Sequence, residues 1–231
     1  MKAALDAKKT VREYKKKLII EAAAKLFYEK GFQKTTLDDI ASSLGVTKPF
    51  VYTYFNSKYS LLEELFDVVY SDLYQGVVGL LEAEEGSPSE RLVAFTKVYL
   101  LKNIEQRSFT AILLEEEKNL SPEKIEAIRK TQKEFDNKLA ALLRDGVRRG
   151  EFEVRDTAVA SLAISGMVRW AHRWYSPAGR LSPEQLCDEM ADLALKLAGA
   201  KCQSGVASAA PGKGGTATGR AAPRRRRAAA K

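Results

Sequence analysis

The feature that most constrains this chain is residues 36–55, a block typical of two short helices that meet at a sharp turn. Thr36 is a favourable N-cap for the first helix, and apolar residues follow it at helical spacing. Gly45 adopts positive φ without strain, so that helix can end within one residue. Thr47 is a second N-cap, and Pro49 falls in the first turn of the next helix, where its missing N–H costs nothing. The block is therefore predicted to be a helix-turn-helix.

A helix-turn-helix reads DNA by placing the start of its second helix in the major groove, while neighbouring groups bind phosphates. The predicted base-facing residues are Thr47, Lys48, Pro49, Phe50 and Tyr52. Tyr52, Tyr54 and Lys58 carry hydroxyl or ammonium donors for phosphates, and Thr36 completes the predicted DNA-binding set. The tyrosines could instead be core aromatics, which is the interpretation we favour for Phe55.

The rest of the chain shows helical periods and almost no β signals, since it lacks strict apolar and polar alternation and has no Asn-Gly or Asp-Gly hairpin. A first helix is predicted over 11–30, a long helix over 57–81 and a short one over 108–118. Further helices begin at clear start signals, namely Ser87-Pro88, Ser121-Pro122, Asp156-Thr157 and Ser182-Pro183. The predicted fold class is all-α: an N-terminal three-helix helix-turn-helix domain followed by a helical bundle.

Charge is segregated along the chain. Residues 1–60 hold twelve Lys or Arg against six Asp or Glu, residues 61–199 hold eighteen against twenty-four, and residues 200–231 hold eight and no acid. A basic head on an acidic body suits DNA binding because phosphates dominate affinity for the duplex, although random scatter of surface charge is the alternative. We predict a DNA-binding domain over 1–60, a ligand-binding and dimerisation domain over 61–199, and a disordered basic tail over 200–231.

The block and its flanks resemble the signature of the TetR family of transcriptional regulators. The matching residues are Thr36, Ile40, Ala41, Leu44 to Lys48, Val51, Tyr52, Tyr54, Phe55, Ser57, Lys58, Leu61 and Leu62. Pro49 and Tyr59 depart from the common pattern, so base contacts at Pro49 and Phe50 are not carried over from the family. The resemblance implies a homodimer that binds a palindromic operator in double-stranded DNA, and a small-molecule effector that releases a repressor from it.

The resemblance also implies an effector cavity in the second domain and a dimer seam formed by the last two helices. The final helix carries one apolar stripe, composed of Leu186, Met190, Leu193, Ala194 and Leu197. Candidate effector residues are aromatic and flexible side chains of the central helices, each of which could equally be plain core: Phe95, Tyr99, Phe109, Leu113, Phe135, Met167, Trp170 and Trp174.

Arg169 and Arg173 lie one turn apart, with Trp170 and Trp174 on the next face. Paired guanidinium groups beside aromatic rings suit a planar or phosphorylated anion. The segment is also similar to a TetR subgroup that senses acyl-CoA thioesters, so both arginines are predicted to bind an acyl- or aryl-CoA effector. The alternative is that they pair with acidic residues of the body.

Other function classes find little support in the sequence. His172 is the only histidine and no phosphate-cradling Gly-rich loop occurs, so we expect neither an enzyme nor a cofactor. Cys187 and Cys202 lie far from metal-ligand spacing, so no metal is expected. The lack of a long apolar run predicts a cytoplasmic protein without a membrane span. An alternative function is non-specific nucleic-acid binding through the Arg-rich tail.

Overall fold

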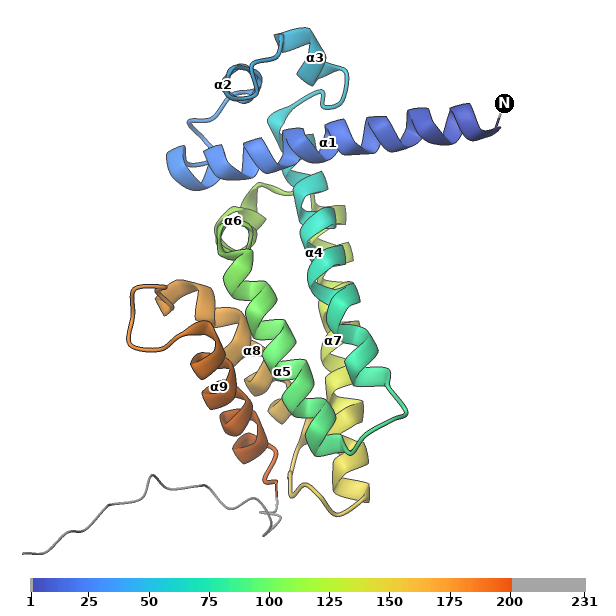
Figure 1. Ribbon diagram of the computed structural model, residues 1–231, viewed down its shortest axis with the longest axis vertical. Helices are drawn as coiled ribbons and strands as arrows, with labels where there is room; N and C mark the ends of the chain where they lie inside the picture. Colours follow the sequence, from blue (N-terminus) through green and yellow to red (C-terminus); the bar gives the residue numbers. More distant parts are fainter. Residues whose placement is uncertain (1, 201–231) are drawn as a thin grey trace, which may run out of the picture. The chain divides into compact units, whose positions relative to one another are not determined.

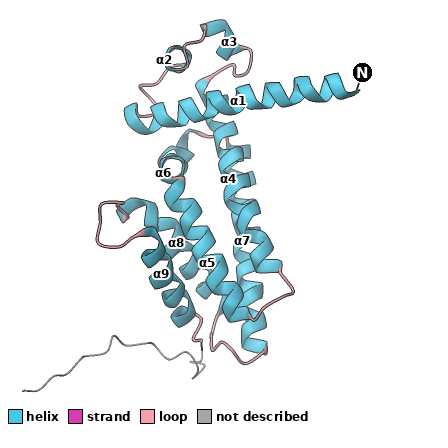
Figure 2. Cartoon of the chain, in the orientation of Figure 1, coloured by secondary structure: helices cyan, strands magenta, loops and turns pink. Residues whose placement is uncertain are grey.

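A computed structural model describes residues 2–200, with side chains from residue 9 onward except those of residues 73 and 75, and over this range the chain is helical without strands (Figure 2). The elements are α1 Lys2–Lys30, α2 Leu37–Ser43, α3 Lys48–Tyr52, α4 Lys58–Glu82, α5 Pro88–Glu105, α6 Arg107–Glu116, the 3-10 turn η1 Glu117–Asn119, α7 Pro122–Arg148, α8 Thr157–Trp174 and α9 Pro183–Leu197. The predicted all-α fold class is confirmed. The predicted disordered tail, and the alternative function that rests on it, lie outside the described residues.

Side-chain caps start the later helices where the sequence predicts them. The hydroxyls of Ser87, Ser121 and Ser182 each accept a hydrogen bond from the backbone N–H three residues on. Asp156 caps α8 in the same way. One boundary was wrong: α1 begins at Lys2 and not near residue 11, because residues 2–10 include the strong helix formers Lys, Ala and Leu and contain no Gly or Pro.

The N-terminal helices pack around one end of α4. Figure 1 shows α1 crossing that end, with α2 and α3 on the side of α1 away from the other helices. Ile19, Ile40, Val51 and Leu62, from four different helices, are fully buried. Burying each such side chain contributes about 1.5–3 kcal/mol, so the short helices α2 and α3 are held by packing rather than by their own length. We call α1 to α3 the head.

The remaining helices surround α5, which contacts α4, α7, α8 and α9 (Figure 1). Leu92, Phe95 and Leu100 of α5 are fully buried, and α9 packs on this helix. We call α4 to α9 the body. The domain boundary predicted at residue 60 falls in the first turn of α4, a helix that also contacts α1 of the head. Within residues 2–200, no helix is both long and apolar enough to cross a membrane.

Candidate nucleic-acid interface and effector cavity

The turn between α2 and α3 has the predicted geometry. The Thr36 hydroxyl accepts a hydrogen bond from the Asp39 backbone N–H at 3.1 Å, and the Asp39 carboxylate accepts one from the Thr36 N–H at 2.9 Å. The Thr36 hydroxyl and the Thr36 N–H both donate to the Asp39 carboxylate, and these two hydrogen bonds lower the pKa of Asp39, which stays ionised. Gly45 has φ +64°, so α2 ends at once. Thr47 takes the N-cap position of α3, but its side chain makes no capping hydrogen bond within the described residues and stays available to another partner.

The outer face of α3 is open to solvent while its inner face is fixed. Val51 is fully buried and anchors the helix. Phe50 and Tyr54 are half-buried and support each other, with ring centroids 5.4 Å apart. The exposed residues of this face are Thr47, Lys48, Pro49 and Tyr52. The predicted base-facing set therefore forms one accessible surface, with Phe50 at its edge.

Two predicted DNA-binding side chains already have partners in the head. The Thr36 hydroxyl is occupied by its cap and also donates to the Asp39 carboxylate at 2.7 Å. The Lys48 ammonium pairs with Asp38 at 2.7 Å, and both groups are exposed. Exposed ion pairs contribute little net stability, so a phosphate or a base edge can replace Asp38 as the partner of Lys48.

Lys58 has a structural role that the sequence did not indicate. Its ammonium donates to the backbone carbonyls of Phe32 and Gln33, both at 2.9 Å, and lies 4.6 Å from the centre of the Phe32 ring. Two of its three N–H donors are thus used to hold the loop after α1. This corrects the prediction that Lys58 serves simply as a phosphate contact, since one donor at most remains for DNA.

We expect Lys58→Met to lower the thermal unfolding midpoint by a few degrees. The change removes the ammonium donor from both loop carbonyls, of which that of Phe32 keeps the Thr35 N–H, and a hydrogen bond to a charged group contributes about 1.5–3 kcal/mol. Circular dichroism melting of this variant is compared with Lys34→Met, an exposed lysine of the same loop. Equal midpoints for the two variants would contradict the structural role of Lys58.

A cavity of about 230 Å³ lies in the body, lined by residues of α4 to α8. Burial raises the pKa of Tyr70, Tyr74 and Tyr99, so their hydroxyls stay neutral. The Gln132 side-chain amide donates to the Tyr70 hydroxyl at 2.6 Å, and that of the buried Asn103 donates to the Tyr99 backbone carbonyl at 2.7 Å. The cavity is therefore rich in neutral hydrogen-bonding groups.

Part of the predicted effector set lines this cavity, namely Tyr99, Leu113, Arg169 and Trp170. The other predicted residues do not: Phe95 and Phe135 are core, Phe109 lines a different cavity, and Met167, Arg173 and Trp174 are absent from the lining. The sequence interpretation missed Tyr70, Tyr74, Asn103, Thr110 and Gln132. Tyr70 and Tyr74 lie one turn apart on α4, and Asn103 follows Tyr99 by one turn, so helical spacing could have identified them.

Arg169 and Arg173 have different surroundings although they lie one turn apart. The Arg169 guanidinium donates to the Ser165 hydroxyl at 3.2 Å, lies 4.0 Å from the Asp136 carboxylate and lines the cavity. Arg173 is exposed and donates to Glu115 at 3.0 Å. Both arginines have an acidic partner, which corrects the predicted paired clamp for one anion and leaves only Arg169 in the cavity.

The head and the body match two parts of one family. Residues 19–65 match the family model described as bacterial regulatory proteins of the tetR family, and residues 85–198 match the tetracyclin repressor-like C-terminal domain. The solved TetR-family regulator PfmR from Thermus thermophilus is 33% identical, with 77% of this chain and 97% of that chain covered and a TM-score of 0.71. The chain belongs to the TetR family. It is thus a DNA-binding transcriptional regulator.

Two further regulators are similar to this chain over most of its length. The transcriptional repressor KstR2 of Mycolicibacterium smegmatis (strain ATCC 700084 / mc(2)155) is 28% identical, over 78% of this chain and 88% of that protein. AibR, solved in complex with isovaleryl coenzyme A and operator DNA, is 26% identical, over 77% of this chain and 96% of that chain, with a TM-score of 0.69. Similarity thus extends through both the head and the body.

The outer faces of α8 and α9 carry large exposed apolar side chains. Val159, Leu162, Trp170 and Trp174 on α8 are 51–61% exposed, and Leu193 and Leu197 on α9 are 43% and 46% exposed. The remaining residues of the predicted α9 stripe, Leu186, Met190 and Ala194, are buried within the chain, which corrects their assignment to a dimer seam. Concentrated apolar exposure of this kind marks an interaction surface, so the outer faces of α8 and α9 are the candidate seam of this TetR-family protein.

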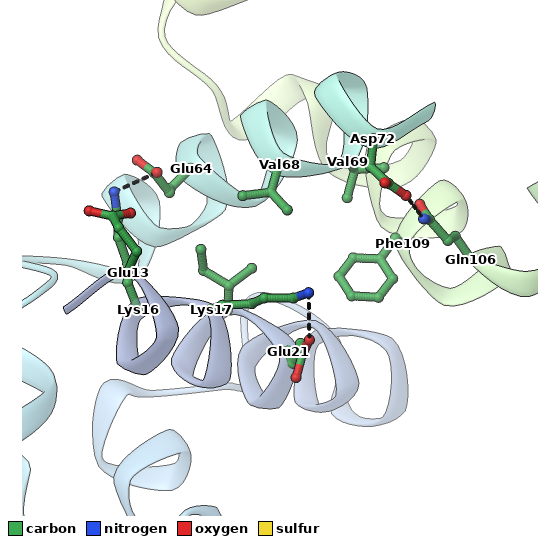
Figure 3. Close-up of a pocket in the computed structure, with 11 residues that line it drawn as sticks. Glu13, Lys16, Lys17, Glu21, Glu64, Val68, Val69, Asp72, Gln106 and Phe109 are labelled. Carbon is green, nitrogen blue, oxygen red and sulfur yellow. Dashed lines mark hydrogen bonds and ion pairs between the residues drawn. The ribbon is translucent and has the colours of Figure 1, made fainter. Parts of the chain in front are cut away.

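A second cavity, of about 420 Å³, lies where α1 meets α4 and α6 (Figure 3). Ile20, Val69 and Phe109 form its apolar wall, and an ion pair between Lys16 and Glu64, at 2.5 Å, lies on its rim. We call it the junction cavity. Beside this cavity α1 lacks close-packed neighbours, although it packs on α4 and α6 elsewhere along its length.

Proposed function

We propose that this TetR-family regulator is a homodimeric repressor that binds a palindromic operator through α3 and is released when a CoA thioester occupies the body cavity. The observation that carries the proposal is the hydroxyl-rich cavity with Arg169 turned into it. Its relative AibR was solved with isovaleryl coenzyme A and operator DNA, which supports this class of effector.

The volume of the cavity limits which part of the effector it can hold. About 230 Å³ is smaller than the roughly 300–1,000 Å³ typical of sites that enclose a whole ligand. The acyl or aryl group therefore enters the cavity, and the nucleotide lies outside it. Arg169 supplies charged N–H donors for the thioester carbonyl oxygen or for a carboxylate on the acyl group.

The phosphates of the nucleotide need a cationic surface near the cavity, and α7 supplies one. Arg129 and Lys133 lie one turn apart, are exposed, and have no acidic partner among the described residues. Both line a groove of about 320 Å³ between α7 and α8. Gln132 lines this groove and the cavity alike. We infer that the phosphates bind Arg129 and Lys133 in place of the predicted Arg173.

Helix α6 connects the cavity to the head. Thr110 and Leu113 of α6 line the cavity, while Phe109 of the same helix lines the junction cavity beside α1. A ligand that displaces α6 would therefore move α1 and change the spacing of the two heads in the dimer. Half-sites lie about 34 Å apart or at multiples of this distance, so both heads cannot stay in register after such a change. Coupling of about 1–3 kcal/mol would lower operator affinity several-fold to about a hundredfold.

Calorimetry with isovaleryl-CoA and longer acyl-CoA thioesters tests the proposal. We expect Arg169→Met to weaken thioester binding on the order of tenfold or more, because hydrogen bonds to a charged donor are lost, while operator binding without ligand is kept. Arg173→Met is the matched control, since Arg173 pairs with Glu115 at the surface. Equal affinity of the Arg169 and Arg173 variants, or no binding by any thioester, would contradict the cavity assignment.

A second arm separates the phosphate site from the acyl site. Arg129→Ala with Lys133→Ala should weaken binding of the CoA thioester but leave binding of the matching acyl-pantetheine, which lacks the nucleotide, unchanged. A parallel loss for both ligands would show that the α7 residues act on the cavity rather than on the phosphates.

We further infer that the protein acts by binding rather than by catalysis, because the family to which it belongs consists of transcriptional regulators. An operator-binding protein must reach the chromosome, so we place it in the bacterial cytoplasm. Incubation of each bound thioester with the protein, followed by chromatography, should return the thioester intact.

A further inference from the structure

Residues 9–18 of α1 precede Ile19, the first fully buried residue among those whose side chains are described, and apart from the half-buried Lys16 they are exposed. At 1.5 Å per residue this stretch is about 15 Å long. Figure 1 shows it continuing past the crossing with α4. Exposure on this scale makes the stretch available to a partner outside the chain.

One side of this stretch faces α4 and has balanced charge. Glu13, Lys17 and Glu21 line the junction cavity together with Lys16 (Figure 3). Lys16 pairs with Glu64 at 2.5 Å, and the ammonium of Lys17 lies 3.9 Å from the Glu21 carboxylate. These lysines are thus partly neutralised by nearby acids.

The side that faces α3 carries positive charge alone. The Lys15 ammonium lies 5.8 Å from the centre of the Phe50 ring in α3. Arg12 is three residues before Lys15 and shares its face of the helix. Neither has an acidic partner among the described residues, and both are exposed. Two cations without an acidic partner therefore lie on the side of α1 that faces α3, the helix predicted to enter the major groove.

We propose that the N-terminal stretch of α1 is a second DNA-binding element, in which Arg12 and Lys15 bind phosphates that flank the base pairs contacted by α3. The inference rests on the proposed operator binding through α3. A helix inserted in the major groove has phosphates along both walls, and Lys15 lies beside such a helix. Arg12 and Lys15 are three residues apart, about 4.5 Å along the helix axis, so together they can bind neighbouring phosphates of one strand. The carboxylates of Glu13 and Glu21 lie on the other side, where they do not oppose the phosphates.

The experiment measures operator affinity against salt concentration for Arg12→Ala with Lys15→Ala. Each lost phosphate contact lowers the slope of log affinity against log salt by about one, and the dimer loses two contacts in each protomer, so the slope should fall by about four. The matched control is Lys17→Ala with Lys25→Ala, which removes the same charge from other faces of α1. A duplex chosen by the wild-type protein from a random library serves as operator, and circular dichroism confirms that both variants fold.

A fall of about four for the first variant and little change for the control would support the second DNA-binding element. An unchanged slope for the first variant, or an equal fall for both, would overturn it. Arg12→Lys with Lys15→Arg should restore the wild-type slope. If the wild-type protein selected no duplex at all, the proposed operator binding would fail first, and the two failures are thereby distinguished.

Discussion

Leu193→Glu with Leu197→Glu is expected to convert the protein to a monomer and to lower its operator affinity by more than about a hundredfold. Both side chains are exposed in the single chain, so the substitutions should leave the fold intact. In the proposed seam they would place unpaired carboxylates between apolar faces, which is strongly destabilising. A monomer holds only one half-site and loses the gain of about 10²–10⁴ that a second linked contact provides.

Light scattering gives the oligomeric state, and fluorescence anisotropy gives the affinity for a selected operator. Val147→Glu is the matched control, since Val147 is an apolar residue of α7 that is 39% exposed away from the candidate seam. The control should stay dimeric and keep its affinity. A double variant that still ran as a dimer with normal operator affinity would refute the α8 and α9 seam.

The second large effect is expected at the recognition helix. Lys48→Ala with Tyr52→Ala should lower affinity for the operator on the order of a hundredfold while changing affinity for unrelated duplexes far less, because base contacts specify sequence. Both side chains are exposed and Val51 still anchors α3, so the helix should keep its place. Tyr54→Phe should instead weaken binding to all duplexes by a similar factor, since its hydroxyl is predicted to bind a phosphate.

Competition between operator and scrambled duplexes measures this difference directly. Lys25→Ala removes one positive charge from α1 instead of α3, and it therefore controls for the loss of positive charge from the head. If the Lys48 and Tyr52 variant lost the same factor on operator and scrambled DNA, the assignment of these residues as base readers would be wrong.

The features that the sequence predicted well are local ones. The sequence predicts helix starts at Thr36, Ser87 and Ser182, and each of these side chains caps its helix together with a partner three residues on, namely Asp39, Glu90 and Gln185. Gly45 marks the turn because few other residues adopt its φ of +64°. Such signals need no knowledge of distant parts of the chain, which is why the helix order and the position of the head could be predicted.

The features that the sequence missed depend on residues far apart in the chain. Lys58 meets carbonyls of the loop after α1, and Arg173 meets Glu115, which is 58 residues away. The Arg169 guanidinium is held by the Ser165 hydroxyl, one turn earlier on α8, and by Asp136 of the neighbouring helix α7. The body cavity likewise draws residues from five helices. Helical periodicity places residues on a face but does not show which neighbour that face meets.

DNA recognition by a two-fold dimer under effector control is tested most directly by selecting duplexes from a random library. The selection is run with the full chain, once alone and once with saturating isovaleryl-CoA or the tightest-binding thioester. We expect the protein alone to enrich a palindrome with half-sites about one helical turn apart, or a multiple of it, and we expect the thioester to remove this enrichment. Enrichment of no sequence, or of one without two-fold symmetry, would contradict the account.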